Sequence, residues 1–331
     1  MSSIQTLISE IIDEKNPVFA LKPQMNELAQ RLKKIVDIDK LLCDRIDEGE
    51  TATNAGLAVS PTMAIMCADD YVRTVQFIRA LHSAILDVNQ LKPETPAQVL
   101  YAGTGPLAIL AIPLMFILTE HQAKFILLDL HQVSIDSVEK IVNALKLNKS
   151  INAIEKIDAF NYQVDNNNPP DIIILEIMQA CLAKEPQVAV SHHLIKQAPK
   201  AILIPQEIKI ELIMVDSKNE FEFIGENKNK TRVRLGNALS INKEQLLGQT
   251  NKGKLALPAI AIQIPKTIPQ HLDAKLFTTI TTYKHHVLKE YDSGLTCPRA
   301  ISCDQDFSLG DTLEFNYQIT NQPELKVHVI N

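Results

Sequence analysis

The 331-residue sequence predicts an α/β fold joined to a β-rich domain, and the spacing of its apolar residues carries that prediction. Strand-like and helix-like runs alternate between residues 97 and 205, as expected for a parallel sheet covered by helices on both faces. Apolar residues recur at helical spacing before residue 60, whereas strand-like runs follow one another after residue 205. We therefore expect a helical N-terminal extension (1–60), an α/β domain (61–205) and a mainly antiparallel β domain (206–331).

The elements of each part follow from the same periodicities. Two amphipathic helices are expected over 4–12 and 25–46, and a third begins with Ser60 as its N-cap and Pro61 in its first turn and runs to about Val88. The α/β part is expected to hold strands at 98–102, 125–130, 153–157, 171–175 and 201–204, and helices at 106–118, 133–145 and 191–196. The β part is expected to hold strands at 208–215, 220–224, 259–264, 276–282, 312–319 and 326–330.

Composition excludes several classes of function. A formal net charge of −6 gives no basic surface for nucleic acid. Five cysteines without a C-x-x-C pair argue against disulfides and structural zinc, and together with an N-terminus that has no basic segment they favour a cytoplasmic location. Residues 99–118 are nearly all apolar, but glycines and prolines interrupt them, so we expect a buried strand and helix and not a membrane span. Four histidines, at 192, 193, 285 and 286, show no metal-ligand spacing, and we expect no metal.

A glycine turn follows the first strand of the α/β part. Gly103, Thr104 and Gly105 lie between a buried strand and the expected helix, where glycines allow close approach of the backbone and a helix start offers free N–H groups. The third glycine of a G-x-G-x-x-G pattern is replaced by Ala108. The turn alone indicates a nucleotide-like ligand.

Two acidic positions at later strand ends narrow that ligand to an adenosine. Asp129, followed by Leu130, ends the next strand, 24 residues after Gly105, where a carboxylate can bind both hydroxyls of a ribose. Asp158 and Ala159 follow the third strand, where a side-chain acceptor can reach an adenine amino group. NAD uses the same turn and first carboxylate and remains an alternative, as does a simple capping role for both aspartates.

Two segments resemble the protein arginine methyltransferases, which are class I S-adenosylmethionine-dependent enzymes with a Rossmann-like sheet. Residues 171–178 (DIIILEIM), with Glu185 nine residues after Glu176, are similar to the family's D-I-I-I-S-E-W-M and its two-glutamate loop. Residues 70–74 (DYVRT), with Phe77 nearby, are similar to its D-x-V-R-T segment. The resemblance covers about residues 60–331 and includes the order of helix, α/β and β parts.

The resemblance implies that the chain binds S-adenosylmethionine and transfers its methyl group. It implies that Arg73 pairs with the carboxylate of that cofactor, that Glu176 borders it, and that Glu176 and Glu185 orient the acceptor. Two carboxylates can hold a cationic guanidinium or amine by charge-assisted hydrogen bonds. Residues nine apart on one helix face opposite ways, so both glutamates serve one acceptor only if the chain turns between them.

The sequence departs from the family at two places. Tyr101 replaces the acidic residue of the first motif, and Thr296-Cys297-Pro298 stands where the family has Thr-His-Trp. We therefore expect N-methylation of a small cationic metabolite with a guanidino or amino group. A protein arginine methyltransferase, an NAD-dependent oxidoreductase and a non-catalytic nucleotide-binding protein are the alternatives. The N-terminal helices can cover the site or form a homodimer interface, and the sequence leaves both open.

Overall fold

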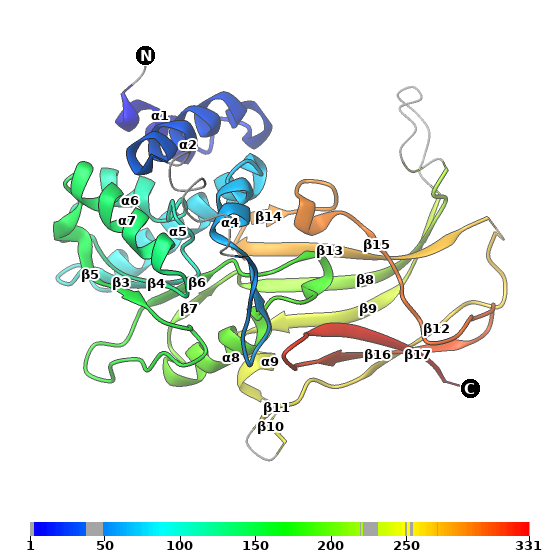
Figure 1. The fold of residues 1–331 in the computed structure, drawn as a ribbon. Helices are drawn as coiled ribbons and strands as arrows, with labels where there is room; N and C mark the ends of the chain where they lie inside the picture. Colours follow the sequence, from blue (N-terminus) through cyan, green and yellow to red (C-terminus); the bar gives the residue numbers. More distant parts are fainter. Residues whose placement is uncertain are drawn as a thin grey trace.

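The computed structural model describes residues 3–37, 49–218, 220, 231–248, 250–251, 254–269 and 271–330. In Figure 1 the blue N-terminal helices lie above the parallel sheet, and the long antiparallel strands extend to the other side of the molecule. Buried residues of the N-terminal extension (Leu28), the α/β part (Phe77, Phe125) and the β part (Phe315) belong to one continuous core. The three parts therefore stabilise one another by shared burial of apolar surface.

The N-terminal extension is helical, as predicted, but its second helix is shorter than expected. The extension holds α1 (Ile4–Ile12), the 3-10 helix η1 (Val18–Leu21), α2 (Lys22–Val36) and a short hairpin of β1 (Thr51–Ala52) and β2 (Leu57–Ala58). Asp37, with φ 56°, ends α2 in a left-handed conformation. The prediction for 38–46 lies outside the described residues.

The third predicted helix is two helices. Ser60 caps α4 (Pro61–Cys67) by accepting the Met63 N–H at 3.2 Å, as predicted. Asp70 then caps α5 (Tyr71–Leu91), and its Oδ2 accepts bonds from Ser293 Oγ at 2.6 Å and Gly294 N at 3.1 Å. The break arises because this carboxylate joins the new helix start to the β part, which periodicity within 60–88 does not reveal.

The five-stranded sheet is entirely parallel, with strand order β5-β4-β3-β6-β7. Its strands are β3 (Ala97–Ala102), β4 (Ala123–Asp129), β5 (Ile151–Lys156), β6 (Ile172–Leu175) and β7 (Ile202–Ile204). Every residue of β6 is buried, and successive side chains point to opposite faces, so both faces of the sheet are covered there. The helical elements of this part are α6 (Ile112–Ile117), α7 (Gln132–Ala144), η2 (Asn148–Ser150), η3 (Ala180–Leu182) and α8 (Gln187–Gln197).

The predicted start of the helix at Pro106 is wrong, because α6 begins at Ile112. Ala108 adopts φ 40°, which a helix cannot accommodate, and Pro113 lies in the first turn, where its missing N–H costs nothing. The apolar stretch 99–118 thus forms part of β3, an irregular turn and α6. Within the described part of the chain, no helix combines the length and apolarity needed to cross a membrane.

The β part forms two antiparallel sheets. One has the order β14-β13-β8-β9, with β15 paired to β13, and the other has the order β12-β16-β17. The strands are β8 (Glu207–Val215), β9 (Arg232–Asn242), β12 (Ile260–Gln263), β13 (Asp273–Tyr283), β14 (His286–Leu288), β15 (Arg299–Ala300), β16 (Thr312–Gln318) and β17 (Glu324–Ile330). Two short strands, β10 (Thr250–Asn251) and β11 (Lys254–Leu255), and two helices, α9 (Lys243–Gly248) and η4 (Gly294–Thr296), complete it.

Five of the six strands predicted for this part are confirmed. Residues 221–224 of the expected strand 220–224 lie outside the described residues. The long strand β9 and the short strands β10, β11, β14 and β15 were not predicted. In β9 the pairing register with β8 skips one residue between Gly236 and Arg234 and another between Leu239 and Asn237. These irregularities disturb the alternation by which a strand is recognised.

Replacing Asp70 with alanine should lower the free energy of unfolding by about 2–3 kcal/mol, because the change removes a helix cap and leaves polar groups of the 293–294 loop without their acceptor. Chemical denaturation of both proteins measures this difference. The matched control is D69A, since the Asp69 side chain is 63% exposed and pairs with Lys33 at the surface. D69A should change stability by less than about 0.5 kcal/mol, and equal losses in the two variants would contradict the anchoring role of Asp70.

Candidate active site

One pocket brings together all the residues that the sequence predicted for cofactor and acceptor. Its lining includes Arg73, Gly103, Thr104, Gly105, Asp129, Leu130, Asp158, Ala159, Glu176 and Glu185. These residues come from the carboxyl ends of parallel strands and from α5, which is where ligands bind in open parallel sheets. The grouping of the residues is observed, whereas their individual roles remain predictions.

The glycine turn needs glycine for its backbone conformation and its packing against protein. Gly103 has φ 76° and Gly105 has φ 58°, both in the left-handed region. A Cβ on Gly103 would lie 2.2 Å from Ile177 Cγ2, and one on Gly105 would lie 3.1 Å from Ala64 Cβ. The absence of a side chain at these glycines therefore allows Ile177 and Ala64 to approach the backbone. The sequence interpretation explains the glycines by the approach of a ligand alone.

Both aspartates accept backbone hydrogen bonds at strand ends, and Asp129 also joins the end of β4 to the glycine turn after β3. Asp129 Oδ2 accepts the Gly105 N–H at 2.8 Å, and its Oδ1 accepts the His131 N–H at 2.9 Å. Asp158 Oδ1 accepts the Phe160 N–H at 2.9 Å. Each carboxylate oxygen has a second lone pair, so these bonds orient the carboxylates in the pocket and leave acceptor capacity for a ligand.

The pocket contains two hydroxyl groups that form no hydrogen bond with the described part of the chain. Within the described residues, Thr104 Oγ1 and Ser134 Oγ are buried without a hydrogen bond, and both residues line the pocket. A buried hydroxyl without a partner costs free energy. A polar ligand bound in the pocket could provide the missing hydrogen-bond partners of these two hydroxyl groups.

A buried ion pair connects α5 to the strand end after β6. Arg73 Nη1 lies 3.2 Å from Glu176 Oε1, and Arg73 Nη2 donates to the carbonyl oxygen of Cys67. Burial lowers the pKa of Arg73, but the neighbouring Glu176, Cys67 and Asp70 outweigh burial and the net shift is upward. Arg73 is thus a fixed cation whose observed partner is Glu176, whereas the resemblance assigned it to a cofactor carboxylate.

The chain turns between Glu176 and Glu185, as it must if both side chains are to reach one pocket. Cys181, Leu182 and Lys184 all have φ between 57° and 63°, a conformation that residues other than glycine rarely adopt. The segment is held in place because Leu182 O accepts the Tyr317 hydroxyl at 2.7 Å. Glu185 consequently points into the pocket that holds Glu176.

The two glutamates share a pocket that disfavours their ionised forms. Burial raises the pKa of Glu176 to about 7, against the opposing charge of Arg73. Burial also raises the pKa of Glu185 to about 8, and the charge of Glu176 adds to this shift. With one arginine beside the two glutamates, the pocket favours protonation of a glutamate.

The two departures from the family pattern have different positions. Tyr101 is buried and lines the pocket, and burial raises its pKa well above its usual range, so its hydroxyl is neutral. Thr296 is buried in η4, where it forms a capping box with Ser293, whereas Cys297 is exposed. The Thr-Cys-Pro segment does not contribute to the described lining of the pocket.

Sequence reasoning missed the residues that approach the pocket from the N-terminal side. Thr53, Ala58, Val59, Ala64 and Cys67 all line it. The β1–β2 hairpin is fixed there because Leu57 N donates to Lys184 O at 2.8 Å and Thr51 Oγ1 lies 3.0 Å from His131 Nε2. These contacts join residues far apart in the sequence, for which a sequence carries no local signal.

Comparison with solved structures identifies the fold. The structure of the Trypanosoma brucei PRMT1 enzyme-prozyme heterotetrameric complex with AdoHcy matches with a TM-score of 0.53 and 16% identity, over 81% of this chain and 92% of that chain. Arabidopsis thaliana protein arginine methyltransferase 10 (TM-score 0.47, 12% identity, 77% and 95% coverage) and PRMT6 (0.47, 10%, 77% and 99%) also match. No family model matches the chain, and no curated protein matches it significantly.

The T. brucei structure shows that this chain has the fold of a protein arginine methyltransferase, a class I methyltransferase fold. The predicted α/β fold with its C-terminal antiparallel β part is therefore confirmed, and so is the resemblance at the level of the fold.

Replacing Glu185 with glutamine should make the folded protein more stable at high pH. The folded-state pKa of Glu185 lies above its usual 4.5, so the stability linked to this group is present below about pH 4.5 and is lost as pH rises through about 8. Glutamine does not ionise, so E185Q does not undergo this pH-dependent loss of stability. The melting temperature of E185Q should equal that of wild type at pH 5 and exceed it by about 5 °C at pH 9.

Thermal denaturation across pH 5–9, without added ligand, measures this difference. E139Q serves as the control, because Glu139 is exposed on α7 and should show no pH-dependent gain. A difference between E185Q and wild type that stays constant with pH would contradict the buried, proton-holding state of Glu185.

Proposed function

We propose that this chain is an S-adenosylmethionine-dependent methyltransferase that methylates a nitrogen of a small cationic guanidino or amino compound. The observation that carries the proposal is that the buried Glu185 and the Glu176 side chain, which is 14% exposed, line the pocket that also contains the glycine turn and Asp129. A site with an excess of buried carboxylates is suited to a cation. The arginine methyltransferase fold supports methyl transfer as the reaction.

The residues present fit an adenosine cofactor. Asp129 would hold the ribose hydroxyls, Asp158 and Ala159 would border the adenine, and Thr104 and Ser134 would supply hydroxyl groups. S-adenosylmethionine supplies an electrophilic methyl group when bound. The AdoHcy in the T. brucei structure supports this choice for the fold.

The two glutamates would orient the acceptor and manage its proton. A cationic acceptor replaces the proton that the carboxylate pair retains, because its charge favours both ionised forms. A pKa near 7 or 8 also suits a group that accepts a proton from the reacting nitrogen near neutral pH. Positioning of that nitrogen by two carboxylates supplies much of the rate.

A small acceptor is proposed because residues of the N-terminal extension form part of the pocket wall and limit the space for a larger acceptor. Thr53, Ala58 and Val59 contribute to its lining, and the segment at 296–298 lacks the family's histidine and tryptophan. A protein arginine side chain is the competing acceptor. A screen of cationic metabolites and arginine peptides for S-adenosylhomocysteine release distinguishes them, and turnover of peptides alone would overturn the small-molecule proposal.

Replacing Thr104 with valine should weaken S-adenosylhomocysteine binding by about tenfold, because the variant loses one hydrogen bond to a bound ligand. It should leave the melting temperature unchanged or slightly raised, because the hydroxyl has no partner among the described residues. Titration calorimetry with S-adenosylhomocysteine, and with NAD in parallel, measures the binding.

The matched control is S137A, which removes another buried hydroxyl without a described partner, but one outside the pocket lining. S137A should bind the ligand as wild type does. Tight binding of NAD without binding of S-adenosylhomocysteine would refute the proposed cofactor, and unchanged affinity in T104V would refute the role of Thr104.

Replacing Glu176 with glutamine should reduce turnover of the acceptor found in the screen by about 100-fold or more, because a neutral amide cannot accept a proton or pair with a cation. Glutamine has the same size and still accepts a hydrogen bond from Arg73, so binding of S-adenosylhomocysteine should change little. Steady-state rates and calorimetry separate the two effects. E139Q is again the control, and turnover of E176Q within tenfold of wild type would remove Glu176 from the mechanism.

A further inference from the structure

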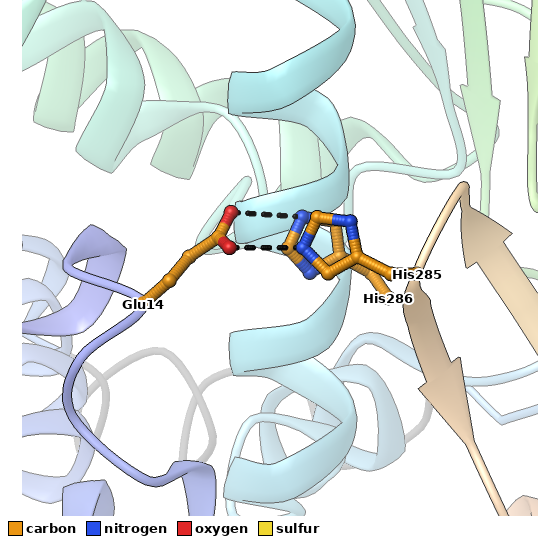
Figure 2. A group of neighbouring side chains, drawn as sticks. All are labelled: Glu14, His285 and His286. Atoms are coloured by element: carbon orange, nitrogen blue, oxygen red, sulfur yellow. Dashed lines mark hydrogen bonds and ion pairs between the residues drawn. The ribbon is translucent and has the colours of Figure 1, made fainter.

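A second cluster of ionisable side chains lies away from the pocket, where the N-terminal extension meets the β part. Figure 2 shows the imidazole rings of His285 and His286 beside the carboxylate of Glu14. Glu14 Oε2 lies 2.9 Å from His285 Nε2, and Glu14 Oε1 lies 3.4 Å from His286 Nε2. The three potential ligand atoms all lie within 4.8 Å of one another.

The ligand atoms are close enough together for one metal ion. Ligand atoms about 2.0–2.1 Å from a tetrahedral Zn²⁺ are about 3.3 Å apart. Each oxygen of the Glu14 carboxylate lies near that distance from one imidazole nitrogen, so small side-chain rotations would bring both nitrogens and one oxygen around a shared ion. Imidazole nitrogens with a carboxylate oxygen are a donor set preferred by Zn²⁺ and neighbouring divalent transition metals.

The surrounding structure positions the chain around Glu14 and the backbone of His286. Arg79 of α5 donates hydrogen bonds to the carbonyl oxygens of Ile11, Asp13 and Asn16 at 2.7–2.9 Å, which fixes the chain on both sides of Glu14. The backbone carbonyl of His286 accepts the Thr282 hydroxyl at 2.8 Å. These backbone contacts reduce the cost of assembling ligands around a metal. The ring nitrogen Nε2 of His286 lies 3.1 Å from Ser83 Oγ, and a metal bound at Nε2 would replace that contact.

The cluster has one buried side and one open side. The His286 side chain is 4% exposed, whereas those of His285 and Glu14 are 65% and 51% exposed. A fourth ligand can therefore come from solvent, as it does in zinc sites with three protein ligands. Arg79 is a nearby positive charge, which would oppose binding of a metal cation. Its guanidinium group donates hydrogen bonds to the backbone carbonyls of Ile11, Asp13 and Asn16, at and after the end of α1.

We propose that Glu14, His285 and His286 form a binding site for a divalent transition metal of the Zn²⁺ type, with a fourth position for water. Bound metal would link the segment after α1 to the turn between β13 and β14, two regions that are 271 residues apart. The site lies outside the pocket lining, so its role would be to secure the N-terminal extension to the β part.

The test uses the full-length chain without an affinity tag, treated with chelator and then titrated calorimetrically with Zn²⁺. We expect one equivalent to bind with micromolar or tighter affinity and to raise the melting temperature. H285A and E14Q should each weaken binding by at least about 100-fold, because each removes a metal ligand. Both residues are largely exposed, so both variants should fold, and the visible spectrum of the Co²⁺ form reports tetrahedral coordination.

Two controls address binding elsewhere. H328A removes a half-buried histidine whose Nδ1 lies 2.9 Å from Asp304 Oδ2, a comparable imidazole–carboxylate pair that forms no three-ligand group among the described residues. C297S removes an exposed thiol. Both should bind Zn²⁺ as wild type does. Absence of stoichiometric binding in the wild type, retention of full affinity in both H285A and E14Q, or loss of binding in H328A or C297S would overturn the proposal.

Discussion

The arrangement of the pocket depends on the buried ion pair between Arg73 and Glu176. An arginine without a partner would be very unfavourable at this depth, so the start of α5 and the strand end after β6 must remain in contact. The same turn of α5 contains Asp70, which binds the 293–294 loop, while Cys67 O at the end of α4 accepts a bond from Arg73. Three parts of the chain therefore meet around one guanidinium.

Helix α5 extends this constraint beyond the pocket. It packs against β3, β6 and β7 of the parallel sheet, against β13 and β14 of the β part, and against α1 and α2. Residues along the helix contact different regions. Arg73 lies in the pocket, Arg79 donates to carbonyls of the segment at the end of α1, and Ser83 contacts the ring of His286. Helix α5 therefore bridges the parallel sheet, the sheet that contains β13 and the N-terminal helices.

The strands and the pocket residues could largely be predicted because their signals are local. An apolar run such as 172–175 followed by a carboxylate marks the carboxyl end of a buried strand, and parallel strand ends converge by topology. The left-handed residues at 181–184, the late start of α6 at Ile112 and the grouping of Glu14 with His285 depend on partners far along the chain. Periodicity carries no information about such partners, so these features required the structure.

The charge balance of the pocket connects its fold to its proposed chemistry. Arg73 balances one of two buried glutamates, and the left-handed loop at 181–184 is the device that brings the second glutamate inward. Folding places a carboxylate in an unfavourable environment and holds it there by contacts such as that between Leu182 and Tyr317. Burial maintained in this way favours the binding of positive charge beside the two glutamates. In the proposed function, a cationic acceptor would supply that charge.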